Sequence, residues 1–470
     1  LINLYKKVKL SDIEKFNYII VGSSFAAHPI IQTLSENKKN NILVIEGGDT
    51  NENDFSEELT LNKEIGNWKD YEQYWAAHWI RAYGGTSRRW SGMCAPLEKK
   101  DFEGNENVPQ WPINKKDLDF FYKKASRFLF RKQNICENQG TVNADIDYKP
   151  YSLPEQLKTF YDLNEDFLKN NNVSIMLNTH VIKLKSKDKK NIDQIIINKN
   201  NKFIKLKIKK QKIILCCGGL GNAQILLQNL LDEDDIMPWN KSILGKNLME
   251  HPHHYVGHGL LSEDFVNMKP SNFGPFTNGF SLSRNIRTEK KLLNCVFEPR
   301  RTNQKLDLET QKIKLYYEKK FNKKLNFYKI FSRSEQSPNI NSYVNILKEK
   351  NNIGLTKLEI NFRIREFDKK SLYESTLIFG EKIMKNKIGV IRANAKEKFN
   401  PTFGGGHTMG TTKMGLNNKD SIVDKNCKVH GISNLYVSGS SVFTSGGAAN
   451  PTLTIVALAY KLGYHLKNNV

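Results

Sequence analysis

Cysteine is scarce in this chain and never stands in a C-x-x-C pair. The 470 residues contain six cysteines, scattered at Cys94, Cys136, Cys216, Cys217, Cys295 and Cys427. This spacing excludes a dense disulfide scaffold, a cysteine-rich zinc site and the haem motif C-x-x-C-H. The adjacent pair at positions 216 and 217 follows an apolar run, where cysteine packs as a small hydrophobe. A reducing, cytoplasmic location is therefore the simplest expectation.

Long apolar runs are missing as well. No stretch reaches the roughly 18 uncharged apolar residues that a membrane-spanning helix needs. The nearest, residues 453–466, is shorter and contains Lys461. Residues 1–16 alternate lysine with apolar positions and lack the continuous apolar core of a secretory signal. We therefore expect no transmembrane segment and no signal within these residues, and an export signal upstream of them is left open.

Acidic residues are outnumbered by basic ones. The chain has 49 Asp and Glu against 72 Lys and Arg, a net charge of +23 and a pI near 9.5. Such a charge can attract nucleic acid, anionic lipid or acidic glycans. Lysine and asparagine are spread throughout, however, and no zinc-finger or RRM signature occurs. We expect a solvated basic surface and no nucleic-acid partner, with membrane and glycan binding left open.

The first half of the chain has the order of a nucleotide-binding unit. Residues 16–21 (FNYIIV) read as a buried strand that enters a turn at residues 22–27, followed by apolar residues at helical spacing. A second apolar run, residues 42–45, ends at Glu46. Strand, tight turn, helix, strand and acid predict a mononucleotide-binding βαβ unit. Residues 213–217 predict another buried strand, which enters Gly218 and a helix. Before it, apolar residues 204, 206 and 208 alternate with lysines, which predicts a half-buried strand with one basic face, and residues 371–384 predict a helix in the second domain.

The glycine turn is a weak motif by itself. Gly22 stands where the dinucleotide fingerprint needs a tight turn, but Ser24 and Ala27 occupy the second and third glycine places. Glu46 strengthens the motif, because a carboxylate there can accept hydrogen bonds from an adenosine ribose. The alternative at this point is an ordinary strand-to-helix turn.

Five further motifs follow in order along the chain. They are RAYGGTS with Trp90 and Gly92 (residues 81–92), WPI (111–113), GKNL with HP (245–252), GHTMGT (406–411) and NPT (450–452). With these motifs the sequence resembles the glucose-methanol-choline (GMC) family of flavin oxidoreductases, from Tyr18 to the C-terminal helix. Residues 335–338 (EQSP) and 435–443 (LYVSGSSVF) are most similar to its sugar and polyol branch, which includes pyranose oxidases and fructose and gluconate dehydrogenases.

The resemblance implies an α/β fold: a Rossmann-like FAD-binding domain and a second α+β substrate domain built on an antiparallel sheet. It places the FAD domain in three parts, residues 1–110, 156–255 and 401–470. A helical lid or substrate region then spans residues 111–155, and the substrate domain spans residues 256–400. The implied cofactor contacts come from the FAD domain: Gly22, Ser23, Ser24, Phe25, Ala26, Glu46, Gly47, Arg81, Gly84, Gly85, Ser87, Trp90, Gly92, Met93, Val181, Gly218, Gly439, Ser440, Pro451 and Thr452.

The resemblance also assigns His407 as the catalytic histidine and Asn450 as its partner. Elementary chemistry agrees, because oxidising an alcohol requires an acceptor for the hydroxyl proton while hydride leaves the carbinol carbon. A neutral imidazole suits that acceptor, and a carboxamide can orient the substrate oxygen. Asn450 is also a candidate N-cap with Pro451 at the first helical position, so capping and substrate contact compete for one side chain.

Three further features concern the site: two departures from the pattern of the family, and one histidine cluster that suggests a metal site. Some relatives bond FAD covalently through a histidine just before the tryptophan of the Gly-Gly segment, and Arg89 stands there, which predicts non-covalent FAD. Gly439 stands where many members of the family carry an acidic residue that contacts the cofactor. Other branches of the family have glycine there, so this position indicates which branch the chain resembles. The run HPHH (residues 251–254) is too compact for a metal site and has no acidic or cysteine cluster beside it. We expect no metal and read His251 as a residue of the cofactor domain.

The sequence thus predicts FAD-dependent oxidation of a hydroxyl group of a sugar, polyol or related alcohol. The electron acceptor is O2, a quinone or a separate redox protein. Two alternatives stay open: a hydroxynitrile-lyase-like flavoprotein without redox turnover, and a non-catalytic basic binding protein with a decayed nucleotide fold.

Overall fold

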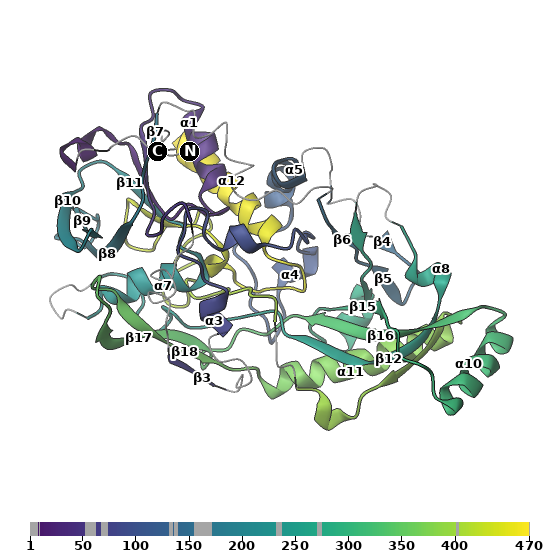
Figure 1. The fold of residues 1–470 in the computed structure, drawn as a ribbon. Helices are drawn as coiled ribbons and strands as arrows, with labels where there is room; N and C mark the ends of the chain where they lie inside the picture. Colours follow the sequence, from purple (N-terminus) through teal and green to yellow (C-terminus); the bar gives the residue numbers. More distant parts are fainter. Residues whose placement is uncertain are drawn as a thin grey trace.

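A computed structural model describes residues 8, 10–51, 63–66, 74–130, 135, 140–154, 172–231, 237–269, 275–400 and 404–469 (Figure 1). Cys136 and most of the first nine residues lie outside this set. None of the described helices is long and apolar enough to cross a membrane.

The nucleotide-binding unit predicted from the sequence forms the centre of a parallel sheet. Its five strands, all parallel, lie in the order β20 (Leu435–Val437), β11 (Lys212–Leu215), β1 (Tyr18–Val21), β2 (Ile42–Ile45) and β7 (Val173–Met176). Every residue of β1 and β2 is buried, as expected of strands covered on both faces. Helix α1 (His28–Ser35) packs against the long C-terminal helix α12 (Thr452–Asn469), which also contacts α5 (Lys116–Phe130).

The basic strand predicted near residue 204 is confirmed as one edge of a small antiparallel sheet. That sheet joins β8 (Thr179–Lys185), β9 (Gln194–Lys199) and β10 (Lys202–Lys207). Asn200 and Asn201 have φ angles of 51° and 59°, so they form the two-residue turn between β9 and β10. Leu206 is buried while Lys205 and Lys207 are exposed, which is the expected alternation.

The second large sheet has seven strands and is antiparallel throughout. Its order is β19 (Gly389–Ala393), β12 (His253–Ser262), β16 (Leu325–Ser334), β15 (Cys295–Arg301), β14 (Phe280–Leu282), β5 (Ile146–Tyr148) and β4 (Gly140–Thr141). The helix α11 (Glu366–Lys385), predicted from residues 371–384, runs along this sheet, and α10 (Leu308–Phe321) lies at the end of the molecule (Figure 1). The α/β fold class with a second antiparallel unit is therefore confirmed.

Several strands cross the sequence ranges expected for the domains. β4 and β5 come from the range expected for a lid and pair into the antiparallel sheet. β17 (Tyr343–Lys350) and β18 (Thr356–Phe362) come from the range of the substrate domain. They instead form a small sheet with β3 (Lys63–Gly66), and this sheet packs beside α7 (Gly218–Gln228). One apolar cluster joins α3 (Tyr74–Ala77), α7 and β18 there.

The remaining elements are short. They are α4 (Lys99–Glu103), β6 (Tyr151–Ser152), α8 (Glu263–Val266), β13 (Phe276–Thr277), α9 (Arg284–Glu289) and the 3-10 helices η2 (Leu10–Lys15), η3 (Gly85–Arg89), η5 (Lys396–Lys398) and η6 (Ser440–Val442).

Candidate active site

A cavity of about 520 Å³ opens at the carboxyl ends of β1, β2 and β11. The starts of α7 and α12 and the loop that holds His407 complete its walls. Parallel sheets bind their ligands at this edge. The cavity brings together His407, Asn450 and the cofactor contacts expected from the sequence: Gly22, Ser23, Ser24, Phe25, Ala26, Glu46, Gly47, Arg81, Gly85, Ser87, Trp90, Gly92, Met93, Val181, Gly218, Gly439, Ser440, Pro451 and Thr452. Of the expected residues, Gly84 alone is not part of the lining.

Gly22 makes the first turn of the cavity wall possible. Its φ is +94°, and a Cβ there would lie 2.6 Å from the backbone oxygen of Cys216. A side chain is therefore excluded on two grounds, conformation and space. Ser24, in the second glycine place, turns its hydroxyl toward the protein: Oγ donates to the Cys216 carbonyl at 3.3 Å and accepts from the Ala26 N–H at 3.3 Å.

Glu46 ties the turn to the segment that contains Gly84. Its Oε2 accepts from the N–H and O–H of Ser23 at 3.1 and 2.6 Å, and its Oε1 accepts from the Gly48 N–H at 2.9 Å. Ser23 Oγ in turn accepts from the Gly84 N–H at 2.8 Å. Gly84 therefore does not line the cavity itself but is hydrogen-bonded to Ser23, which does. Burial raises the pKa of Glu46, and hydrogen bonds from Ser23 oppose that rise.

His180 adds a polar group that the sequence patterns did not single out. It is buried at the cavity wall next to Gly47, and its Nδ1 has no hydrogen-bond partner among the described residues. Desolvation lowers the pKa of His180 to about 3, with the Arg81 guanidinium contributing. A neutral ring with an unused nitrogen is therefore available to a ligand at this end of the cavity.

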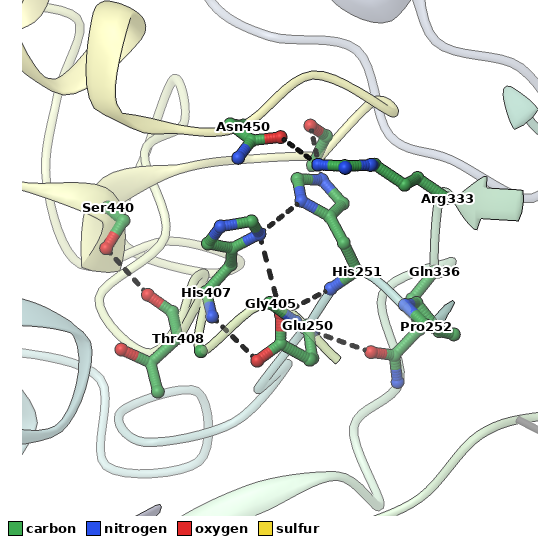
Figure 2. A network of polar contacts seen from close by, with 12 residues as sticks. Glu250, His251, Pro252, Arg333, Gln336, Gly405, His407, Thr408, Ser440 and Asn450 are labelled. Atoms are coloured by element: carbon green, nitrogen blue, oxygen red, sulfur yellow. Dashed lines mark hydrogen bonds and ion pairs between the residues drawn. The ribbon is translucent and has the colours of Figure 1, made fainter. Parts of the chain in front are cut away.

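His407 stands on a glycine loop that folds tightly around it. A Cβ at Gly405 would lie 2.3 Å from His407 Cε1, so the ring packs directly over that glycine. Below the ring, the fully buried Glu250 accepts from the His407 N–H at 2.6 Å, and its Oε1 lies 3.7 Å from His407 Nδ1 (Figure 2). Desolvation lowers the pKa of His407 well below 6.5, and His251, His253, Arg333 and His78 lower it further. The ring is neutral at physiological pH.

His251 determines which nitrogen of His407 carries the proton. His251 Nε2 lies 3.2 Å from the Gly446 carbonyl, and because a carbonyl only accepts, that nitrogen must hold a hydrogen. Burial lowers the pKa of His251 to about 4, so its ring is neutral and its Nδ1 is an acceptor. His407 Nδ1, 2.9 Å away, is therefore the donor of that bond (Figure 2). The lone pair of His407 is left on Nε2.

Arg333 fixes the orientation of Asn450 in the same way. Its Nη1 donates to Asn450 Oδ1 at 3.2 Å (Figure 2). Its guanidinium also pairs with Glu298, with Nε 2.5 Å from Oε1. Because Oδ1 is used by Arg333, the Asn450 NH2 group is the part left to donate to a ligand. The helix α12 begins at Thr452, and the Ile455 N–H donates to the Pro451 carbonyl, one residue later than the expected N-cap. Asn450 thus contacts Arg333, and Pro451 stands at the helix boundary.

Other expected features have plain outcomes. Cys216 is buried as a small hydrophobe, and both Cys216 and Cys217 contribute to the cavity wall. Arg89 lines the cavity beside Trp90, and Gly439 lines it with a φ of +115°. Among the described residues no group of three or more His, Cys, Asp or Glu is placed to hold a metal ion. The histidines of the HPHH run instead face Phe331, Phe399 and His407.

The sequence patterns did not identify the buried residues that contact the His407 loop and Asn450. Glu250, Tyr74 and Arg333 were not singled out, and His251 was assigned only to the cofactor domain. Glu250 immediately precedes the recognised HP segment, so its position carried a signal. Tyr74 and Arg333 stand in no motif, and only the fold brings them against Glu250 and Asn450.

Comparisons with known proteins place this geometry in a wider context. Residues 338–459 match the sequence model of the GMC oxidoreductase family. The chain is 40% identical to the 2-methyl-1,2-propanediol dehydrogenase of Mycolicibacterium austroafricanum over 79 residues, 17% of this chain and 14% of that protein. It is 23% identical to the fructose dehydrogenase large subunit of Gluconobacter japonicus over 266 residues, 55% of this chain and 47% of that protein. The alignments thus span less than half of each relative.

The fold match extends over the whole chain. The crystal structure of pyridoxine 4-oxidase from Mesorbium loti superposes with a TM-score of 0.61 at 14% identity, covering 97% of this chain and 100% of that one. At this identity the structural match shows the fold alone, and the family model matches only the C-terminal part of the chain. Residues 338–459 are therefore similar in sequence to the GMC oxidoreductase family, within a chain whose fold is similar to that of pyridoxine 4-oxidase.

Proposed function

We propose that this chain is an FAD-dependent oxidoreductase that oxidises a hydroxyl group of a sugar, polyol or related alcohol to the carbonyl. The observation that carries the proposal is the His251–His407 hydrogen bond, which assigns the lone pair of His407 to Nε2, in a cavity that also holds the Asn450 NH2 group. A proton acceptor and an oxygen-orienting donor are the two groups that alcohol oxidation asks of a protein.

The residues of the cavity fit FAD. The turn that begins at Gly22 lines the cavity, and Ser24 in its second glycine place directs its hydroxyl toward the protein backbone. Glu46 stands where it can accept from a ribose. The unused Nδ1 of His180 lies next to Gly47 and would gain a partner from a bound adenosine. When bound, FAD supplies the acceptor for the hydride that leaves the carbinol carbon. Arg89 cannot form the histidyl bond, which supports non-covalent attachment.

His407 performs the proton step in this proposal. Its Nε2 accepts the hydroxyl proton of the substrate, and its Nδ1–H stays hydrogen-bonded to Nδ1 of His251 throughout. The imidazolium that results is stabilised by the carboxylate of Glu250, whose Oε1 lies 3.7 Å from Nδ1. Asn450 donates to the substrate oxygen and holds it toward Nε2. Burial keeps His407 neutral before the reaction, so the base is ready over the physiological pH range.

The substrate class rests on the motifs and on the relatives. Two of the matched proteins are named as dehydrogenases of a diol and of fructose, and the sequence motifs of residues 335–338 and 435–443 are similar to the sugar and polyol branch. The electron acceptor in this proposal is O2, a quinone or a separate redox protein.

An absorbance screen tests the proposal. The purified yellow protein is mixed anaerobically with panels of sugars, polyols, amino alcohols and aromatic alcohols, and loss of flavin absorbance is recorded. We expect bleaching by at least one sugar or polyol, with one carbonyl product formed per flavin. Cleavage of a cyanohydrin without bleaching would favour a lyase instead, and a protein that stays colourless after FAD is added would favour a non-catalytic binding protein.

A further inference from the structure

The carboxylate of Glu250 lies at the centre of the backbone that presents His407. It is fully buried, and both of its oxygens accept hydrogen bonds. Oε1 accepts from the His251 N–H at 2.7 Å and from the Gly405 N–H at 3.3 Å. Oε2 accepts from the His407 N–H at 2.6 Å and from the Tyr74 hydroxyl at 2.8 Å. All four contacts are donors, which is the arrangement that an ionised carboxylate satisfies completely.

Tyr74 extends the same arrangement to one more amide. Its hydroxyl accepts from the Gly406 N–H at 2.8 Å while donating to Glu250. Of three successive amides in the His407 loop, the carboxylate thus holds those of Gly405 and His407 directly and that of Gly406 through Tyr74. Glu250 itself is fixed from the other side, because its N–H donates to Gln336 Oε1 at 2.8 Å (Figure 2). The carboxylate therefore joins the segment of His251 to the loop of His407, two segments that lie far apart in the chain.

We infer that Glu250 is a positioning residue that sets the His407 loop and the His251–His407 hydrogen bond in their working geometry, an inference that rests on the proposed function. The physical reason is that the backbone of the His407 loop sets the direction of the His407 ring. That backbone has glycine at 405 and 406, and glycine has little conformational preference of its own. Without the carboxylate, the amides of His251, Gly405 and His407 lose their acceptor at once, and the Tyr74 hydroxyl loses its own acceptor. A misplacement of about 1 Å at a reacting group can cost about 100-fold in rate.

The Glu250→Gln variant tests this directly. The amide group keeps the shape of the side chain but replaces one acceptor oxygen with a donor, which then faces an N–H or O–H donor. We expect flavin reduction at saturating substrate to fall about 10- to 100-fold, with FAD still bound. Glu250→Asp keeps the charge at shorter reach and should lose less. Glu318→Gln is the matched control, because Glu318 also accepts a backbone N–H, from Leu325 at 2.8 Å, in α10 outside the cavity lining.

A pH profile separates positioning from simple stability. Burial raises the pKa of Glu250 to about 7, opposed by its hydrogen bonds from His251, Tyr74 and His407. The titratable groups that face it are Tyr74 from α3, His407 from its loop and His251 from its own segment. Below about pH 7 the wild-type carboxylate gains a proton and loses an acceptor site, so flavin reduction should slow toward the Glu250→Gln rate. The Gln variant should lack that acidic limb, because the pKa of His407 is held well below 6.5.

Hydrogen exchange gives a readout that needs no turnover. Amides of residues 404–409 in the FAD-loaded protein should exchange faster in Glu250→Gln than in wild type or Glu318→Gln. Wild-type exchange together with a wild-type reduction rate in the Gln variant would overturn the inference. If no alcohol bleaches even the wild-type flavin, the proposed function fails, whereas the exchange experiment still decides the role of Glu250 in holding the loop.

Discussion

Replacing His251 isolates the hydrogen bond that places the lone pair of His407 on Nε2. In His251→Leu a methyl group takes the position of Nδ1, and His407 Nδ1–H loses the acceptor that lies 2.9 Å away. In His251→Asn the carboxamide oxygen stands near that same position and restores an acceptor. Both variants lose the bond to the Gly446 carbonyl, so their difference reports the His251–His407 bond alone.

The magnitude follows from the strength of one neutral hydrogen bond. Such a bond contributes about 1 kcal/mol, within a range of about 0.5–1.5, which corresponds to a roughly 2- to 13-fold change in the population of the productive tautomer. Glu250 Oε1, 3.7 Å from the same nitrogen, can take over part of the role and keeps the loss toward the low end. Loss of the general base itself costs about 100- to 10,000-fold, so the two effects are separable.

Stopped-flow reduction of the flavin under saturating alcohol is the assay. We expect His251→Leu to be a few-fold to about 13-fold slower than wild type, and His251→Asn to recover most of that loss. His258→Leu, in β12 where the ring stacks on Phe327, is the control and should leave the rate unchanged. A His251→Leu protein with the wild-type rate would refute the tautomer argument. A loss of 1,000-fold or more would show that His251 itself accepts the proton.

Three further predictions concern the cofactor and the substrate oxygen. Gly22→Ala should weaken FAD binding and lower the melting temperature, because a Cβ 2.6 Å from the Cys216 carbonyl at φ +94° stores about 1–3 kcal/mol of strain; unchanged FAD titration would contradict this. Acid precipitation should release all yellow colour into the supernatant, and colour that stays in the pellet would disprove non-covalent FAD. Arg333→Met should slow flavin reduction with FAD retained, because it frees Asn450 Oδ1 and lets the amide turn; it also leaves Glu298 buried without its 2.5 Å partner, so melting temperature is measured alongside. A rate that is unchanged in a folded Arg333→Met protein would exclude the orienting role.

Local patterns predicted the local structure well. The run from Tyr18 to Glu46 forms the expected strand, turn, helix and strand because buried parallel strands and tight glycine turns leave direct marks on the sequence. The alternating lysines near residue 205 and the helix near residue 371 were legible for the same reason. Motif order also placed His407 and Asn450 in one cavity, although nothing local joins them.

What the sequence did not predict depends on contacts between distant segments. Glu250 meets the His407 loop across 157 positions of sequence, and Arg333 meets Asn450 across 117. Likewise, β3 pairs with β18, and β5 pairs with β14, between ranges that were expected to belong to separate domains. No periodicity within one segment encodes such partners, since pairing is settled only when whole sheets assemble. The residues that position His407 and Asn450 are therefore the part of the site that only the three-dimensional structure reveals.

Anaerobic reduction of the flavin in His407→Ala tests the central claim most directly. The variant removes the only group to which we assign proton acceptance, and the ring lies over Gly405 where truncation leaves the backbone contacts of Glu250 intact. With an alcohol that bleaches the wild type, we expect the variant to bind FAD and to bleach about 100- to 10,000-fold more slowly. Bleaching at the wild-type rate would contradict the account, because the proton of the alcohol would then leave by another route.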